Sequence, residues 1–282
     1  MGKTEHSITL EHRQADGAVA IQQVPVTAAH ADIDVAPVMD FQPFKAWAAT
    51  LQRQLANHHA DDVAIDRIQV QSVDYFKNQQ MGFVKFQVAA SLRASGAPLP
   101  GVVFMRGGSV CILLVLSPSD PTPSASESQE HVVLTVQPRL PIAHIQFAEL
   151  PAGMLDGSGA FKGKAAQELE EETGIKVQEH GLVDITELAL GSPEASGQPS
   201  GIYMSPGGCD EFMRILLCRK TMPRHQIEEL RGQLTGLRKE GEAITLRLCP
   251  LKDLWRETRD AKALAAIALY QGLKAEGRLP PA

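Results

Sequence analysis

The most informative stretch of the chain runs Glu149-Leu-Pro-Ala-Gly-Met-Leu-Asp156 and continues, after four residues, as Phe161-Lys-Gly-Lys-Ala-Ala-Gln-Glu-Leu-Glu-Glu-Glu-Thr-Gly-Ile175. The order of residue types predicts the end of a strand, a tight bend around Gly153 and a short helix that stops at Gly174. Four of the five residues from 168 to 172 are carboxylates. The sequence therefore brings a bend and a dense group of negative charges close together along the chain.

The acidic residues of this predicted helix do not all face the same way. At helical spacing, Glu168, Glu171 and Glu172 share one side, next to an apolar side with Leu169, whereas Glu170 points away. Like charges at this spacing repel each other by roughly a few tenths of a kcal/mol per pair, and a cation between them reverses that effect. A Glu-rich helix is usually just solvated. The preceding bend favours a metal site, because Mg²⁺ takes both carboxylate and carbonyl oxygens.

Length and composition are those of an ordinary globular protein. The chain has 282 residues, with 44% hydrophobic and 21% charged residues, which suits one or two domains. The formal net charge of -6 argues against a general nucleic-acid partner and against binding to an anionic membrane. The four cysteines lack metal-binding spacing and are too few for a disulfide scaffold, which predicts reduced thiols in an intracellular protein.

The sequence also bears on localisation. No apolar run reaches the length of a membrane span. The first residues lack the apolar core of a signal peptide, and Glu5, Glu11 and Asp16 are unlike an organellar transit peptide. We therefore expect a cytoplasmic protein without a membrane partner.

Turn signals near residues 95–98 divide the chain into an N-terminal α+β subdomain, residues 1–100, and a second domain, residues 101–282. In the first part, a helix opening at Asp40 carries Phe44, Trp47, Leu51 and Leu55 on one face, which predicts core packing. Strands are expected there at residues 7–10, 19–26, 65–75 and 82–89.

The second part predicts a central sheet with flanking helices. Paired strands are expected at residues 110–116 and 131–136, separated by a Ser- and Pro-rich loop. Further expected strands are 182–190, 212–218 and 244–248, and further expected helices are 226–237, 250–257 and 262–274. Residues 191–208 read as a long loop of the kind that often has a function.

The stretch from Gly153 to Ile175 resembles the Nudix box, Gly-x5-Glu-x7-Arg-Glu-U-x-Glu-Glu-x-Gly-U, where U is aliphatic. Two positions depart from it, because Gly159 replaces the first Glu and Gln167 replaces the Arg. Other stretches resemble the ADP-sugar pyrophosphatase branch of the Nudix hydrolases. They are Val102-Val-Phe-Met-Arg-Gly107, Glu149-Leu-Pro-Ala-Gly-Met-Leu-Asp156, Ser205-Pro-Gly-Gly-Cys-Asp-Glu211, and the tail from Thr235-Gly-Leu-Arg through Leu254-Trp to Leu269-Tyr270.

This resemblance implies an α/β (α+β) fold, with a Nudix α/β/α sandwich around a mixed sheet. It implies hydrolysis of the pyrophosphate bond of ADP-glucose or ADP-ribose, giving AMP and a sugar phosphate. The implied cofactor is Mg²⁺, with Mn²⁺ as the alternative, since divalent cations bridge phosphate oxygens and lower the pKa of water. The implied assembly is a homodimer in which the N-terminal subdomain contributes to the partner's substrate site.

The resemblance also implies roles for individual residues. Glu168 and Glu172 are the expected metal ligands, with the Ala152 carbonyl as a third. Glu171 is either a further ligand or the group that orients the attacking water. Glu211, on the Ser-Pro-Gly loop, is the expected general base, with a solvated turn residue as the alternative.

Two arginines are the expected substrate-binding residues. Arg139 matches the arginine that follows the preceding strand in this branch, and its guanidinium suits a phosphate. A surface ion pair is the alternative for Arg139, and a cap at a strand end is the alternative for Arg106. The first Glu and the Arg of the box are both missing here, at Gly159 and Gln167, so no single charge is left without its partner. These two departures leave a catalytically weakened nucleotide-sugar binding protein as an alternative function. A UDP-sugar pyrophosphatase is a second alternative, because the sequence does not define the base pocket.

Overall fold

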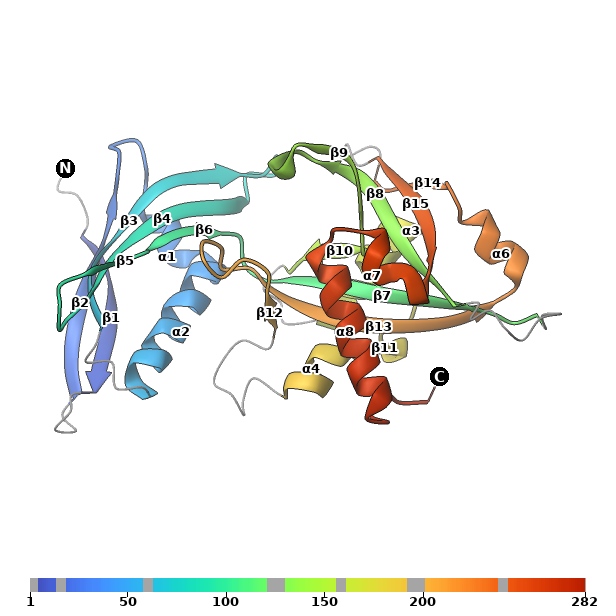
Figure 1. Cartoon of the computed structure of the whole chain (residues 1–282). Coiled ribbons are helices and arrows are strands. Elements are labelled where there is room, and N and C mark those ends of the chain that lie inside the picture. Colours follow the sequence, from blue (N-terminus) through green and yellow to red (C-terminus); the bar gives the residue numbers. More distant parts are fainter. Residues whose placement is uncertain are drawn as a thin grey trace. The chain divides into compact units, whose positions relative to one another are not determined.

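The computed structural model describes residues 5–13, 19–57, 63–120, 130–155, 161–191, 201–237 and 243–281. The chain forms two compact units (Figure 1). The first unit consists mainly of Met1–Gly108 and Tyr203–Phe212, and the second mainly of Ser109–Ser192 and Met213–Ala282. The segment Tyr203–Phe212 thus belongs to the first unit, whereas the sequence analysis assigned all residues after 100 to the second domain.

The first unit is a sheet covered by two helices, α1 (Ala36–Asp40) and α2 (Gln42–Asn57). Its sheet, six-stranded among the described residues, has the order β1-β2-β3-β4-β5, with β6 also on β4. Strands β2 and β3 are parallel and the other pairs are antiparallel. The strands are β1 (His6–Arg13), β2 (Val19–Ala28), β3 (Val63–Tyr75), β4 (Met81–Leu92), β5 (Pro98–Leu99) and β6 (Val102–Met105).

Helix α2 packs on this sheet through the face that the sequence predicted. Phe44 is 1% exposed and stacks on Trp47, and Phe86 of β4 meets both rings edge-on. Leu55 is buried as well, and Leu51 packs against the same cluster. The predicted core role of these residues is therefore confirmed, with aromatic contacts adding to the area that they bury.

The second unit is built around a mixed sheet of order β11-β13-β7-β8-β15-β14, in which β7 and β13 run parallel. Strand β10 pairs with β7, and β9 pairs with β8. The strands are β7 (Ser109–Pro118), β8 (His131–Arg139), β9 (His144–Glu149), β10 (Ala152–Met154), β11 (Leu182–Asp184), β12 (Ile202–Tyr203), β13 (Phe212–Met222), β14 (Leu234–Thr235) and β15 (Ile244–Pro250).

Helices cover both faces of this sheet. Every residue of β7 from Ser109 to Leu116 is buried, which requires cover on two sides. Helix α3 (Phe161–Thr173) and helix α8 (Ala261–Ala275) both contact β7, and Figure 1 shows α8 in front of the sheet and α3 behind it. The second unit is therefore the α/β/α sandwich with a mixed sheet that the sequence predicted.

Two predicted elements are wrong. Residues 182–190 were expected to form one strand, but the strand β11 ends at Asp184 and helix α4 (Ile185–Leu190) follows. The reason is a helix cap, because the Asp184 carboxylate accepts the backbone N–H of Glu187 at 2.8 Å.

The predicted helix at residues 226–237 is also shorter than expected. Helix α6 (Arg224–Glu229) ends before Gly232, whose φ of +74° breaks the helix, and the chain continues into β14. The remaining helix of the C-terminal part is α7 (Leu254–Glu257), preceded by a 3₁₀ turn at Leu251–Asp253. Within the described residues, no helix is long and apolar enough to cross a membrane.

Candidate active site

The predicted bend and acidic helix are held together by the central strand of the second unit. Strand β10 pairs with β7 so that Gly153 faces Val110, and the Pro151 carbonyl accepts the N–H of Ile112 at 2.9 Å. On the helix, Ala165 and Leu169 are fully buried in the same core cluster as Val110. The bend and α3 are therefore both packed against strand β7, which fixes the distance between them.

The end of α3 follows from its sequence. Gly174 has a φ of +73°, a left-handed conformation that glycine adopts without strain, and its N–H donates to the Glu170 carbonyl at 2.8 Å. The Thr173 hydroxyl also donates to the Leu169 carbonyl, at 2.5 Å. The carboxylates thus lie in the last two turns of a helix with a well-defined stop.

Glu172 is buried, with 6% of its surface exposed. Its Oε2 accepts the backbone N–H of Ala152 at 3.1 Å, so it contacts the bend directly. Burial, followed by the charge of Glu168, raises the pKa of Glu172 to about 8, and the Ala152 N–H opposes this only in part. Without a cation, this carboxyl therefore holds its proton at neutral pH.

Glu168 lies one helical turn earlier and comes close to the bend at Gly153. A Cβ at Gly153 would meet the Glu168 Cδ at 2.1 Å, so only glycine lets the backbone come this close. The Lys164 ammonium lies 2.7 Å from Glu168 Oε1, and both side chains are largely buried. Ala152, Glu168 and Glu172 are therefore brought together, as the sequence predicted.

This arrangement fits a hard divalent cation. The carboxylates of Glu168 and Glu172, which repel each other, lie beside the backbone of Ala152 and Gly153. Carboxylate and backbone carbonyl oxygens are the donors that Mg²⁺ uses when it keeps several waters. Among the described residues no group of three or more His, Cys, Asp and Glu side chains has metal-binding geometry. Glu168, Glu172 and one backbone oxygen would be a smaller donor set, which water would have to complete.

Gln167, which stands where the box has Arg, has a partner of its own. Its Nε2 donates to Glu171 Oε1 at 2.8 Å and so orients that carboxylate along the helix. Glu170 is exposed and pairs with Lys176 at 3.1 Å, away from the cluster as predicted. The other departure, Gly159, lies outside the described residues.

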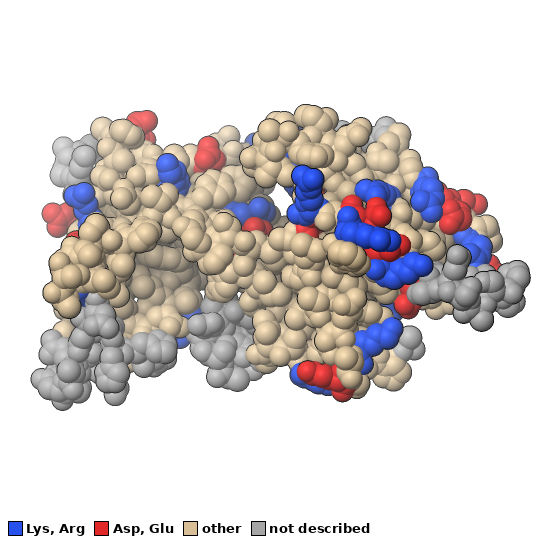
Figure 2. Space-filling model, viewed as in Figure 1, with Lys and Arg blue, Asp and Glu red and all other residues tan. Residues whose placement is uncertain are grey.

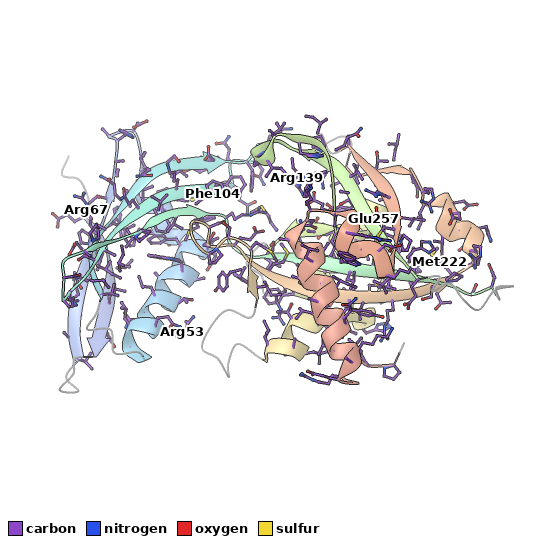
Figure 3. The ribbon with its side chains drawn as sticks, in the orientation of Figure 1. Arg53, Arg67, Phe104, Arg139, Met222 and Glu257 are labelled. Carbon is purple, nitrogen blue, oxygen red and sulfur yellow. The ribbon has the colours of Figure 1, made fainter. Side chains whose placement is uncertain are left out.

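Arg139 makes an ion pair, but not the surface pair considered from the sequence. Its Nε donates at 2.6 Å to Oε1 of Glu149, and Glu149 is only 3% exposed. The Arg139 side chain itself is 41% exposed (Figure 3). Its charge lies near enough to Glu172 to lower the pKa of that carboxyl slightly. Arg139 therefore lies beside the carboxylate cluster with its head reaching solvent.

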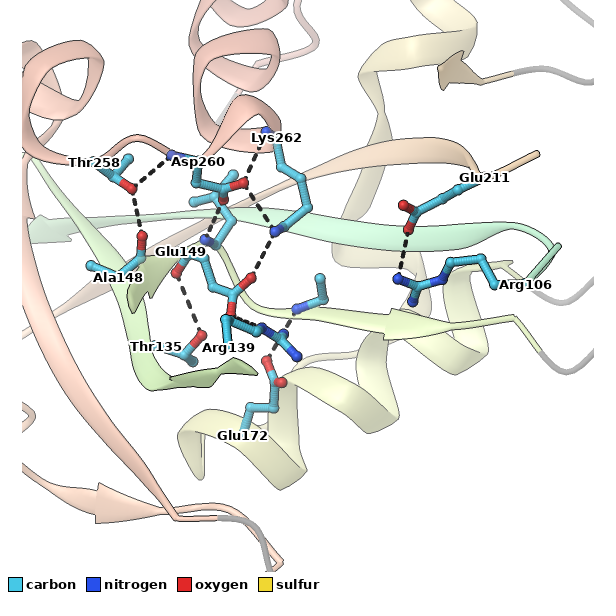
Figure 4. Close-up of polar contacts among 12 residues, drawn as sticks. Arg106, Thr135, Arg139, Ala148, Glu149, Glu172, Glu211, Thr258, Asp260 and Lys262 are labelled. Atoms are coloured by element: carbon cyan, nitrogen blue, oxygen red, sulfur yellow. Dashed lines mark hydrogen bonds and ion pairs between the residues drawn. The ribbon is translucent and has the colours of Figure 1, made fainter. Parts of the chain in front are cut away.

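Glu149 belongs to a buried charge network that the sequence did not reveal. Its second oxygen accepts the Lys262 ammonium at 2.8 Å, and Lys262 also lies 3.0 Å from Asp260 (Figure 4). Burial lowers the pKa of Lys262, but Asp260 and Glu149 outweigh this and raise it above its ordinary value. The one signal in the sequence is Glu149 itself, a charged residue directly before the apolar pair Leu150-Pro151.

The remaining predicted residues, Arg106 and Glu211, lie in the first unit. The Arg106 Nη1 is 3.6 Å from Glu211 Oε1, so these two are neighbours. Asp210, which the sequence analysis did not select, accepts the backbone N–H groups of Arg106 at 2.7 Å and Gly107 at 3.1 Å. Burial raises the pKa of Asp210. The Ser205–Glu211 loop is therefore hydrogen-bonded, through Asp210, to the backbone that follows β6.

Charged side chains are mixed in sign on the face drawn in Figure 2. Lys and Arg lie next to Asp and Glu over the second unit, and wide areas of other residues separate these groups. Single-sign fields of the kind that steer polyanions are not seen on that face among the described residues.

Comparison with known proteins places the chain in a family. The family model of the NUDIX domain matches residues 124–269. Nudix hydrolase 14, chloroplastic, of Arabidopsis thaliana is 37% identical over 255 residues, which cover 90% of this chain and 78% of that protein. A crystal structure of an ADP compounds hydrolase covers 77% of this chain and 97% of its own, with 16% identity and a TM-score of 0.49.

The matched family model and the 37% identical relative show that the chain is a hydrolase. The chain belongs to the Nudix hydrolase family.

Proposed function

We propose that this Nudix hydrolase cleaves the pyrophosphate bond of ADP-sugars such as ADP-glucose and ADP-ribose, giving AMP and a sugar phosphate. The observation that carries the proposal is that Glu172 contacts Ala152 and Glu168 lies against Gly153, so both carboxylates meet the same bend. The resemblance of the Ser205–Glu211 stretch and the C-terminal tail to the ADP-sugar branch supports the substrate class.

The cofactor in this proposal is Mg²⁺, with Mn²⁺ as the alternative. Glu168, Glu172 and the Ala152 carbonyl would hold it. When bound, such a cation neutralises phosphate oxygens and acidifies a water. Glu172 has to release its proton for this, which its raised pKa makes a measurable event.

The chain's own residues would do the rest. Water attacks one phosphorus, the bridging P–O bond breaks, and the second phosphate leaves with the bridging oxygen. Arg139 would bind the phosphate oxygens with its exposed head. Glu171, oriented by Gln167, would be a further ligand or orient the water. Glu211 would accept the water's proton and Arg106 would contact substrate, roles that the family resemblance supports.

The test is product analysis with ADP-ribose, ADP-glucose, UDP-glucose and GDP-mannose at saturating Mg²⁺. We expect AMP from the two ADP-sugars, loss of turnover with a chelator, and loss of turnover in Glu172→Gln. Glu170→Gln is the matched control, because Glu170 is exposed on the same helix. UMP as the main product would replace this proposal by a UDP-sugar pyrophosphatase. Binding without turnover of any substrate would identify a weakened nucleotide-sugar binding protein.

We further propose a cytoplasmic homodimer, on the sequence and on the common occurrence of two-fold dimers. Light scattering of the purified chain tests the assembly, and a single monomeric species would refute it.

A further inference from the structure

The carboxylate of Glu149 is shared by two cations from distant parts of the second unit. Oε1 accepts Arg139 Nε at 2.6 Å and Oε2 accepts Lys262 Nζ at 2.8 Å. Because Glu149 is 3% exposed, water cannot replace either partner. Removing one partner of a buried ion pair leaves an uncompensated charge, so the geometry at Glu149 depends on both cations.

Lys262 comes from the first turn of α8 and is itself held in place. Its ammonium lies 3.0 Å from Asp260 Oδ1, and the same oxygen accepts the Lys262 backbone N–H at 3.0 Å. The other oxygen, Oδ2, accepts the backbone N–H of Leu150 at 3.0 Å. One turn of helix thus fixes both the Glu149 side chain and the Leu150 backbone.

The fixed segment leads directly into the bend of the candidate site. Leu150 is followed by Pro151, whose carbonyl is held by β7, and by Ala152, whose N–H contacts Glu172. The backbone from Leu150 to Ala152 is therefore anchored at each residue, first by α8, then by β7 and then by α3.

Arg139 is held by one edge of its guanidinium. Glu149 engages Nε, and the two terminal nitrogens of Arg139 have no hydrogen bond within the described residues. A planar guanidinium fixed in this way presents its terminal nitrogens as a rigid fork, which matches two oxygens of a phosphate. Figure 4 shows Arg139 between Glu149 and Glu172.

We propose that Lys262 is a positioning residue for substrate, which locks Arg139 through Glu149 so that the guanidinium fork meets the diphosphate of a nucleotide-sugar. The substrate class rests on the proposed function. Asp260 supports this arrangement, because its two carboxylate oxygens hold the Lys262 ammonium and the Leu150 backbone N–H. A purely structural ion pair would show itself in stability, whereas a positioning residue shows itself in substrate affinity.

The test is the variant Lys262→Met, which keeps the length of the side chain and removes its charge. We expect the KM for ADP-ribose to rise roughly 10- to 100-fold with a smaller change in kcat. Lys262→Arg restores most of the affinity, because it returns a cation to Glu149. Lys274→Met is the matched control on the same helix, where Lys274 is exposed, and leaves KM unchanged.

A double variant shows whether Lys262 affects substrate affinity through Arg139 or independently of it. In an Arg139→Gln background, Lys262→Met raises KM little further if Lys262 acts through Arg139. Full additivity, or an unchanged KM in folded Lys262→Met, overturns the proposal. If Lys262→Met does not fold, Lys262→Gln, whose amide still donates, takes its place in the same cycle. If the wild type turns over no nucleotide-sugar, the cycle is measured on the calorimetric Kd for ADP, and absence of ADP binding overturns both proposals.

Discussion

Replacing Glu172 by glutamine changes one property of the candidate site and keeps its shape. The amide oxygen can still accept the Ala152 N–H, which lies 3.1 Å from Oε2 in the wild type. What disappears is a carboxyl whose pKa is raised from 4.5 to about 8, first by burial and then by the charge of Glu168. The variant should therefore differ from the wild type in its pH dependence more than in its fold.

The sign of the effect follows from counting protons. Between pH 4.5 and about 8, the unfolded chain has lost this proton while the metal-free folded chain keeps it. The unfolded state binds fewer protons, so the free energy of unfolding falls as the pH rises through this window. One proton gives a slope of up to about 1.4 kcal/mol per pH unit. Glu172→Gln lacks this slope, so its stability relative to the wild type increases by a few kcal/mol, roughly, from acid to pH 8.

The assay is urea unfolding of both proteins in chelator, at pH values from about 5 to 8.5. Glu170→Gln is the control and should follow the wild type, since Glu170 is exposed and pairs with Lys176. Adding Mg²⁺ should stabilise the wild type more than Glu172→Gln and release a proton, visible as a buffer-dependent heat in calorimetry. Equal pH dependence in wild type and Glu172→Gln would refute the reasoning.

Three further changes test the surroundings of the site. Gly153→Ala places a methyl group against the flexible end of Glu168, so we expect roughly tenfold weaker activation by Mg²⁺ with little change in melting temperature. Gln167→Leu removes the hydrogen bond to Glu171, and kcat should fall roughly tenfold with KM for Mg²⁺ nearly unchanged if Glu171 orients water. Asp184→Ala removes the N-cap of α4 and one of the two ion-pair partners of the buried Arg214 of β13. The remaining partner of Arg214 is Glu187, which is half-exposed. We expect a loss of roughly 3 kcal/mol in urea unfolding with unchanged KM.

The carboxylate cluster could be predicted from the sequence because its geometry is local. Glu168 and Glu172 are four residues apart on one helix, and the bend lies a short loop away, so spacing alone placed them on one side. The network at Glu149 could not be found in this way. Its partner Lys262 is 113 positions further on, and its place depends on how α8 packs against the sheet, which periodicity within α8 does not specify.

The errors in secondary structure have similar causes. The apolar residues of 182–190 suit a buried strand or a helix equally, and the cap at Asp184 resolves the ambiguity only through its bond to Glu187. At residues 226–237 the apolar spacing continues past Gly232, but the backbone there turns left-handed. In both places a single residue with a specific backbone role overrides the hydrophobic pattern.

The charges of the candidate site suggest how a cation enters without disturbing the fold. Without one, Glu168 is paired with the Lys164 ammonium and Glu172 is protonated at neutral pH. A divalent cation brings two positive charges and needs both carboxylates ionised, so it replaces one proton and one ammonium contact. Because two positive charges enter and one proton leaves, the net charge around α3 rises by one on binding. The ion pairs of Glu149 with Arg139 and Lys262 involve neither Glu168 nor Glu172, so we expect Arg139 to keep its contact with Glu149 when the cation binds.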